Sequence, residues 1–175
     1  HLLEEGKDEE ARRQLDQLSH FIKGKVIYST SGNTIIDGLV NYKLQSVASE
    51  NIKVETEIVV PEQLNIDIAI FITLLVNLLD NALEALKKVD WEQRILTIKI
   101  VFSQERLIGR ITNTYCGEIH QKDDKILTSK KEKQKHGYGL GNVEKIIKKY
   151  NGYMEINHTG EEFRVDFIIY LPQKN

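Results

Sequence analysis

Cysteine is almost absent from this sequence: Cys116 is the only one among 175 residues. A single cysteine excludes an intramolecular disulfide and a metal site built from several cysteines, so the composition suits a reducing, cytoplasmic compartment. An excess of charge of one sign is also lacking, because 24 basic and 26 acidic residues leave a net charge of −2. No broad cationic face is available for nucleic acid, and a small anion is the expected ligand.

Long hydrophobic runs are missing as well. The longest run, Ile68 to Val76, is far shorter than the roughly 20 residues that cross a bilayer, and no charged-then-apolar leader opens the chain. We therefore expect no membrane contact by these residues. A hydrophobic share of 41% suffices for one ordinary domain with a filled core and a short lead-in. Since the sequence starts inside a helical pattern and without Met, we expect a piece of a longer protein.

Apolar periodicity indicates an α/β protein, with helical and alternating segments in turn. Helices are expected over 7–22, 34 to about 49, 67–88 and 142–150, the second of them after N-cap candidates in 29–33. Strands are expected over 26–28, 52–60, 95–102, 107–113, 153–157 and 163–171. The predicted fold is an α+β two-layer sandwich with a mixed, largely antiparallel sheet and helices on one face.

Three connections have sequence signals of their own. Residues 103–106 are expected to form a hairpin turn between antiparallel strands. Asn151 and Gly152 are expected to end the last helix as a left-handed C-cap pair. Glu118 to Lys135 contain ten charges and no apolar periodicity, so we expect a structureless lid there.

Three glycines at alternate positions, Gly137, Gly139 and Gly141, follow a lysine-rich segment and precede the last predicted helix. Backbone amides and a helix N-terminus would converge there, an arrangement that binds phosphate. A dinucleotide fingerprint would follow a strand directly, and a Walker A loop would continue with Gly-Lys-Ser/Thr, so both common alternatives fail. Glycines that serve only turn geometry remain an alternative.

A polar stripe runs along the otherwise apolar helix predicted over 67–88. It consists of Thr73, Asn77, Asp80, Asn81 and Glu84. An asparagine amide oxygen is a hard, neutral ligand for Mg²⁺, so Asn81 is the predicted metal ligand, and Asn77 lies one turn earlier on the same face. The alternative is that both asparagines bond to neighbouring backbone, while Asp80 and Glu84 are more often solvated charges. Together, stripe and glycines predict an ATP site.

Several lysines and a histidine precede the three glycines in the sequence. Lys130 is the preferred candidate to contact the triphosphate, and His136 is placed to donate to a phosphate oxygen. A solvated charge run and a structural histidine are the alternatives.

These motifs resemble the Bergerat-fold ATP-binding domains of gyrase-type ATPases, Hsp90-type chaperones, MutL-type repair proteins and histidine kinases. Asn77-x-x-x-Asn81-Ala82 is similar to the family's N box, and Gly137-x-Gly139-Leu140-Gly141 to its second glycine box. The resemblance covers roughly Ser29 to Pro172.

More narrowly, the chain resembles the AgrC-type peptide-pheromone receptor kinases of quorum sensing. The residues that carry this likeness are the run from Asn77 to Ala85, Thr128-Ser129-Lys130, His136-Gly137-x-Gly139-Leu140 and Lys149-Tyr150-Asn151-Gly152. The resemblance implies an ATP site formed by Asn77, Asn81, Glu84, Ala85, Asn113, Thr128, Ser129, Lys130, His136, Gly137, Gly139, Leu140 and Gly141. Asn77, Asn81 and Lys130 would have the catalytic roles.

The usual first glycine box, Asp-x-Gly-x-Gly, is absent, and the matching place reads Ile111-Thr112-Asn113. The AgrC-like group also carries Asn there. The amide oxygen of Asn113 would accept a hydrogen bond from the adenine amino group, as a neutral and weaker acceptor than aspartate. Ala85 is a candidate for the apolar wall beside the base.

Kinase and hydrolase differ at one position. In the gyrase and chaperone branches a glutamate four residues before the metal-binding Asn activates water, and here that position is Asn77. An amide cannot take the proton. The resemblance therefore implies a site that holds ATP and Mg²⁺ for transfer of the γ-phosphoryl to a histidine and then to a response-regulator aspartate. The full protein would be a homodimeric, membrane-anchored bacterial sensor with this domain in the cytoplasm.

The phosphoacceptor is not evident. Residues 1–24 resemble the turn and second helix of a dimerisation hairpin, and 25–175 the catalytic domain. No histidine is followed by Asp or Glu, so the acceptor is expected upstream of His1, with His1 or His20 as alternatives. Two rival functions are a gyrase-type or chaperone-type hydrolase, which would turn over ATP, and a non-enzymatic interaction module, which would not bind it.

Overall fold

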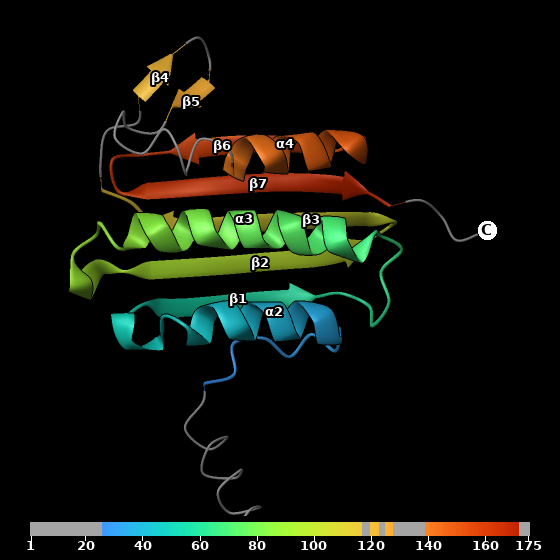
Figure 1. The fold of residues 1–175 in the computed structure, drawn as a ribbon, viewed down its shortest axis with the longest axis horizontal. Coiled ribbons are helices and arrows are strands. Elements are labelled where there is room, and N and C mark those ends of the chain that lie inside the picture. The colour runs from blue at the N-terminus through green and yellow to red at the C-terminus, as the bar shows by residue number, and fades with distance from the viewer. Residues whose placement is uncertain (1–25, 117–119, 123–124, 128–138, 172–175) are drawn as a thin grey trace, which may run out of the picture.

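Five strands of the computed structural model, which describes residues 26–116, 120–122, 125–127 and 139–171, form one sheet in the order β1-β2-β3-β7-β6. They are β1 (Lys53–Val59), β2 (Ile95–Ser103), β3 (Arg106–Thr114), β6 (Tyr153–His158) and β7 (Glu162–Tyr170). β1 pairs with β2 in parallel, and the other neighbours are antiparallel. The helices α2 (Thr34–Gln45), α3 (Ile68–Leu86) and α4 (Gly139–Lys149) lie on one face of this sheet (Figure 1). The predicted mixed two-layer sandwich is confirmed.

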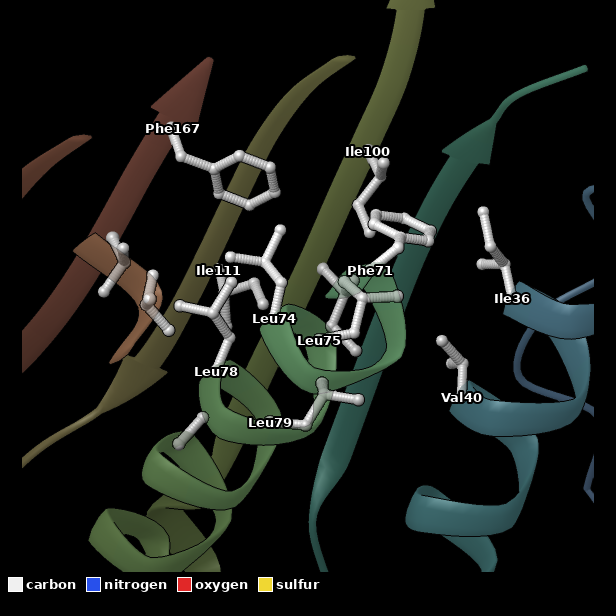
Figure 2. Packing of buried hydrophobic residues seen from close by; sticks show 14 of the residues in the cluster. Ile36, Val40, Phe71, Leu74, Leu75, Leu78, Leu79, Ile100, Ile111 and Phe167 are labelled. Atoms are coloured by element: carbon white, nitrogen blue, oxygen red, sulfur yellow. The ribbon is translucent and has the colours of Figure 1, made fainter. Parts of the chain in front are cut away.

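α3 is the central helix of the core. Asp67 caps it by accepting from the backbone N–H groups of Ala69 and Ile70. Its buried face consists of Phe71, Leu74, Leu75, Leu78, Leu79, Ala82, Leu83 and Leu86. Figure 2 shows Leu74, Leu75, Leu78 and Leu79 of α3 packed among buried residues that include Ile100 and Ile111 of the sheet. α3 is long and apolar enough to cross a membrane by length and composition, but its place in this core accounts for its hydrophobicity.

α2 begins where the sequence predicts and ends earlier. Asn33 is the cap, and its Oδ1 accepts from the N–H of Ile36 at 3.1 Å. The helix was expected to reach about residue 49, but it ends at Gln45 and a 3₁₀ helix, η1 (Ala48–Glu50), follows. The cause lies in the last turn, where the hydroxyl of Ser46 donates to the carbonyl of Lys43 at 2.6 Å. Such side-chain bonds compete with helix continuation.

The strand predicted over 26–28 does not form. Instead, the side chain of Asn41 takes the place of a neighbouring strand. Its Oδ1 accepts from the N–H groups of Tyr28 at 2.7 Å and Ser29 at 3.0 Å, and its Nδ2 donates to the carbonyl of Ser29 at 2.9 Å. These bonds attach the segment to a helix, and the hydroxyl of Thr56 on β1 also donates to the carbonyl of Tyr28.

Asp37, one turn before Asn41, holds the rest of this segment. Its carboxylate accepts from both the hydroxyl and the N–H of Ser31, from the hydroxyl of Ser29 at 2.6 Å and from the N–H of Gly32 at 3.0 Å. Burial acts to raise the pKa of Asp37, but these hydrogen bonds outweigh it and hold the pKa below its ordinary value.

A lowered pKa of Asp37 makes the contribution of this residue to stability depend on pH. Since the carboxyl binds its proton more weakly in the folded state, the contribution is present above the unfolded-state pKa and is lost as pH falls through the folded-state pKa. We expect Asp37→Asn to lose about 1–2 kcal/mol of unfolding free energy at pH 7 and much less at pH 3. Urea unfolding at both pH values measures this, with Asp90→Asn as the control, because Asp90 makes no capping bond. A difference that does not change with pH would contradict the prediction.

The lid predicted over 118–135 is not structureless throughout. β4 (His120–Lys122) and β5 (Lys125–Leu127) pair as a small antiparallel sheet. Strands this short show no apolar periodicity, so the charge-rich sequence concealed them. The turn predicted over 103–106 is confirmed, and its two central residues, Gln104 and Glu105, have φ values of 49° and 57°.

Candidate nucleotide site

α4 begins at Gly139, so the prediction that this helix starts at Asn142 was wrong. Gly139, Leu140 and Gly141 form its first turn. Low helix propensity made these glycines read as a loop, but a helix N-terminus tolerates glycine better than a helix interior. The amides that the sequence assigns to phosphate binding are therefore helical ones. Among the first four residues of a helix, N–H groups have no partner within the helix.

Nothing in the described part of the fold requires either glycine. Among the described residues Gly32 is the glycine with positive φ, so Gly139 and Gly141 need no left-handed backbone. A Cβ added to Gly141 would meet no described atom within 4 Å, and one added to Gly139 would meet Asn77 Oδ1 at 3.6 Å, an ordinary contact. As far as the described residues are concerned, the space beside these two residues is open, as a ligand that approaches the backbone requires.

Asn77 connects the two predicted motifs. Its Nδ2 donates to the carbonyl of Thr73 at 2.8 Å, and its Oδ1 lies beside Gly139 at the start of α4. The C-terminal end of α4 lies beside the N-terminal end of α3, because the hydroxyl of Tyr150 accepts from the N–H of Asp67 at 3.2 Å. α4 is thus antiparallel to α3, and its N-terminus faces the polar stripe.

The remaining stripe residues lie further along α3. Asn81 and Glu84 are half-buried, and so is Ala85 beside the stripe. Asp80 was expected to be a solvated charge, but its carboxylate bonds to Lys43 of α2 at 2.7 Å. Lys43 and Asp80 are far apart in the sequence, so no local pattern signals this pair.

Asn113 is buried at 2% exposure on the helix-facing side of β3. Its Nδ2 donates to the carbonyl of Thr114 at 2.8 Å, which leaves Oδ1 as the group available to a ligand. The thiol of Cys116 donates to the carbonyl of Lys88 at 2.9 Å. This bond holds the end of β3 that bears Asn113 against the end of α3 that bears Ala85.

Tyr115, which the sequence analysis did not single out, lies at this end of the sheet. Its ring packs against Phe163 with centroids 6.0 Å apart. Burial raises the pKa of the Tyr115 hydroxyl, and the nearby charge of Lys88 opposes this in part. The hydroxyl therefore stays protonated at neutral pH.

Several predicted site residues lie outside the described residues. They are Thr128, Ser129, Lys130, His136 and Gly137. Within the described part no three His, Cys, Asp or Glu side chains form a cluster that could hold a metal ion. Among the oxygen donors of the stripe, the amide oxygen of Asn81 is the predicted ligand. That donor fits Mg²⁺, which binds few protein ligands and takes the rest from phosphate and water.

A mixed five-stranded sheet covered on one face by helices, with a glycine-bearing helix N-terminus opposite a polar helical stripe, is the Bergerat architecture of ATP-binding domains. The chain belongs to the GHKL family, whose domain it matches over residues 66–170. This family membership implies ATP binding. A search of curated proteins found no match.

Solved histidine kinase structures share the fold. The catalytic domain of the histidine kinase ThkA matches with a TM-score of 0.60 at 21% identity, over 81% of this chain and 93% of that one. The histidine kinase AdeS of Acinetobacter baumannii matches with a TM-score of 0.58 at 15% identity, over 94% of this chain and 84% of that one. The mycobacterial sensor histidine kinase MprB matches with a TM-score of 0.52 at 13% identity, over 79% and 96%.

Proposed function

We propose that this chain is the ATP-binding catalytic domain of a sensor histidine kinase of the AgrC-like group. It would transfer the γ-phosphoryl of ATP to a histidine outside these residues, from which a response regulator takes it. The observation that supports the proposal is that no described atom fills the space beside Gly141 and that Asn77 Oδ1 lies next to Gly139. Glycines that neither the backbone nor the packing requires are explained by a bound phosphate.

Each site residue then has a role. The N–H groups of Gly139, Leu140 and Gly141 would bind phosphate oxygens, and Lys130 and His136 would add charge and a donor. Gly137, Thr128 and Ser129 are assigned to ATP binding by the family resemblance. Asn81 holds Mg²⁺, which supplies charge neutralisation when bound. Asn113 Oδ1 accepts from the adenine amino group, while Ala85 and Glu84 border the base.

Transfer is favoured over hydrolysis by what surrounds Asn77. Its amide is engaged with the carbonyl of Thr73 and has no basic atom to activate water. The adjacent carboxylate, Asp80, is bound by Lys43 at 2.7 Å, and proton abstraction would cost it that ion pair. A γ-phosphoryl held in this site would await another acceptor.

The wider setting follows from the same proposal. Residues 1–24 would belong to a dimerisation hairpin and 25–175 to the catalytic domain, in the cytoplasmic part of a membrane-anchored bacterial sensor that acts as a homodimer.

Calorimetric titration with a non-hydrolysable ATP analogue, with and without Mg²⁺ and beside the GTP analogue, tests the proposal. We expect binding that needs Mg²⁺ and prefers adenine. Failure to bind either nucleotide at about millimolar concentration would overturn it in favour of an interaction module. Steady ATP turnover by the isolated chain would instead favour a hydrolase.

Gly141→Ala separates a ligand role of the glycine from a folding role. We expect the nucleotide affinity to fall at least about tenfold, because a Cβ occupies the space next to the phosphate. We expect the unfolding free energy to stay equal or to rise by about 0.5 kcal/mol, because alanine favours the helix. Calorimetry and urea unfolding measure the two quantities.

Gly38→Ala is the matched control, since Gly38 lies in α2 and its Cβ would also meet no described atom within 4 Å. It should change stability in the same direction and leave nucleotide affinity unchanged. Equal affinity of Gly141→Ala and wild type would remove the main support for the proposed phosphate site.

A further inference from the structure

The hydrogen-bonding groups of adenine are more than one asparagine can bind. The amino group of this base lies between two acceptor nitrogens of the purine ring, N1 and N7, and one carboxamide reaches the amino group and at most one of them. Asn113 is such a carboxamide, and one N–H of its Nδ2 is already donated to the carbonyl of Thr114 at 2.8 Å. Because a buried acceptor without a donor weakens binding, a complete adenine site needs a second donor beside Asn113.

Tyr115 is the neighbour of Asn113 on the helix-facing side of the sheet. Side chains two positions apart on a strand point the same way, about 7 Å from one another. The extended pairing continues past the end of β3, because the N–H of Tyr115 donates to the carbonyl of Glu161 at 2.8 Å. Asn113 is buried, and the ring of Tyr115 is half-buried against the same core. The two side chains therefore border the same space, between the sheet and the helices.

The ring of Tyr115 is held at the end of this space. Phe163, which is opposite Asn113 in the register of β3 and β7, packs against it with the centroids 6.0 Å apart and the planes tilted by 46°. The thiol of Cys116 bonds to the carbonyl of Lys88, just after α3. Since the start of α4 lies beside Asn77, in the middle of α3, Tyr115 is at the end of the site away from the proposed phosphate amides.

The hydroxyl of Tyr115 is available as a donor. Burial and the charges of Lys88 and Cys116 act on its pKa, and no hydrogen bond to a described residue contributes. The net effect raises the pKa, so the hydroxyl keeps its proton at neutral pH. In the pattern Asp-x-Gly-x-Gly the place of Tyr115 is a glycine, which has no side chain to offer. This donor is therefore an addition of the present chain.

We propose, on the basis of the nucleotide site proposed above, that Tyr115 is a second base-binding residue. Its ring closes the base end of the site, and its hydroxyl donates to the purine ring nitrogen that Asn113 does not reach. Adenine is then bound by an acceptor on Asn113 and a donor on Tyr115, two residues of one strand. The second donor offsets the weakness of a neutral amide as the acceptor of the amino group.

Calorimetric titration of Tyr115→Phe with the non-hydrolysable ATP analogue and Mg²⁺ tests the hydroxyl. We expect a dissociation constant about three- to tenfold higher than that of the wild type, as for the loss of one hydrogen bond. Tyr28→Phe is the matched control and should bind as the wild type does, because Tyr28 is also half-buried but lies against α2. Equal affinity of Tyr115→Phe and a wild type that binds would overturn this proposal and leave the proposed function standing.

Two modified nucleotides identify the bonded nitrogen. The 1-deaza and 7-deaza forms of ATP lack N1 and N7 respectively. With the form that lacks the nitrogen bound by Tyr115, wild type and Tyr115→Phe should have equal affinities, whereas with the other form the difference between them should persist. A difference that persists with both forms would mean that the hydroxyl bonds to neither nitrogen, and would overturn the proposal.

Inorganic tripolyphosphate separates base binding from folding. It has no base, so it should bind the wild type, Tyr115→Phe and Tyr115→Ala equally in the presence of Mg²⁺. A loss of tripolyphosphate affinity as large as the loss of ATP affinity would show that Tyr115 acts through the fold, and would overturn the proposal. Tighter binding of ATP by Tyr115→Ala would also overturn it, because the ring would then obstruct the base rather than contact it.

Discussion

Asn81→Ala is expected to abolish the magnesium-dependent part of nucleotide binding, with an affinity at least about a hundredfold lower. Asn81 lies one turn after Asn77, whose Oδ1 is at the N-terminus of α4. In the described part of the chain no cluster of acidic, His or Cys side chains could replace its amide oxygen as a ligand. Calorimetry with the non-hydrolysable ATP analogue, with and without Mg²⁺, measures the loss.

Two further variants make this result specific. Asn81→Asp keeps a hard oxygen ligand and should retain most of the affinity in Mg²⁺. Asn157→Ala removes a half-buried asparagine from β6, outside the proposed site, and should bind as the wild type does. Binding by Asn81→Ala that still depends on Mg²⁺ would show that another residue holds the metal.

Gly152→Ala is expected to lower the unfolding free energy by about 2–4 kcal/mol. A Cβ at this position would lie 2.1 Å from the carbonyl oxygen of Ile168 and 3.0 Å from that of Ile147. Both are backbone atoms and cannot rotate away. Asn151 has the left-handed φ of 52°, and the N–H of Gly152 bonds to the carbonyl of Ile147 at 2.9 Å, so the helix ends in a Schellman motif. Glycine is therefore required at position 152 because two backbone carbonyl oxygens lie too close for a side chain. The residue with the left-handed backbone conformation is Asn151.

Gly160→Ala is the matched control for this prediction. Gly160 lies between β6 and β7, and a Cβ there would meet no described atom within 4 Å. We expect a change within about 0.5 kcal/mol, measured by urea unfolding beside Gly152→Ala. A small effect of Gly152→Ala would mean that the β6–β7 pair shifts easily against α4.

The parts of the fold that depend on local repetition could be predicted from sequence. The buried face of α3 follows from apolar residues at helical spacing, and the β2–β3 hairpin follows from two alternating runs around a short turn. The GHKL family follows from motifs within α3 and at the start of α4. In each case the signal and the structure lie within the same few residues.

Features that depend on distant side chains could not be predicted. The 26–28 segment is held by Asn41 rather than by a strand, and Asp80 is bound by Lys43 of another helix. The end of α2 and the start of α4 also differ from the predicted positions. The Ser46 hydroxyl bond ends α2 early, and α4 includes Gly139 and Gly141 in its first turn, neither of which apolar periodicity can indicate. The roles of Asn81, Asn113 and Lys130 in a nucleotide site remain predictions.

The bonds that Asn41 and Asp37 make to the segment before α2 also fix how the chain enters the domain. Seven hydrogen bonds, three to Asn41 and four to Asp37, connect residues 28–32 to the helix. The hydroxyl of Thr56 on β1 also donates to the carbonyl of Tyr28, so the segment is fastened to both layers of the domain. Whatever the preceding residues carry is therefore connected to the sheet and to the helices through the same five residues, 28–32.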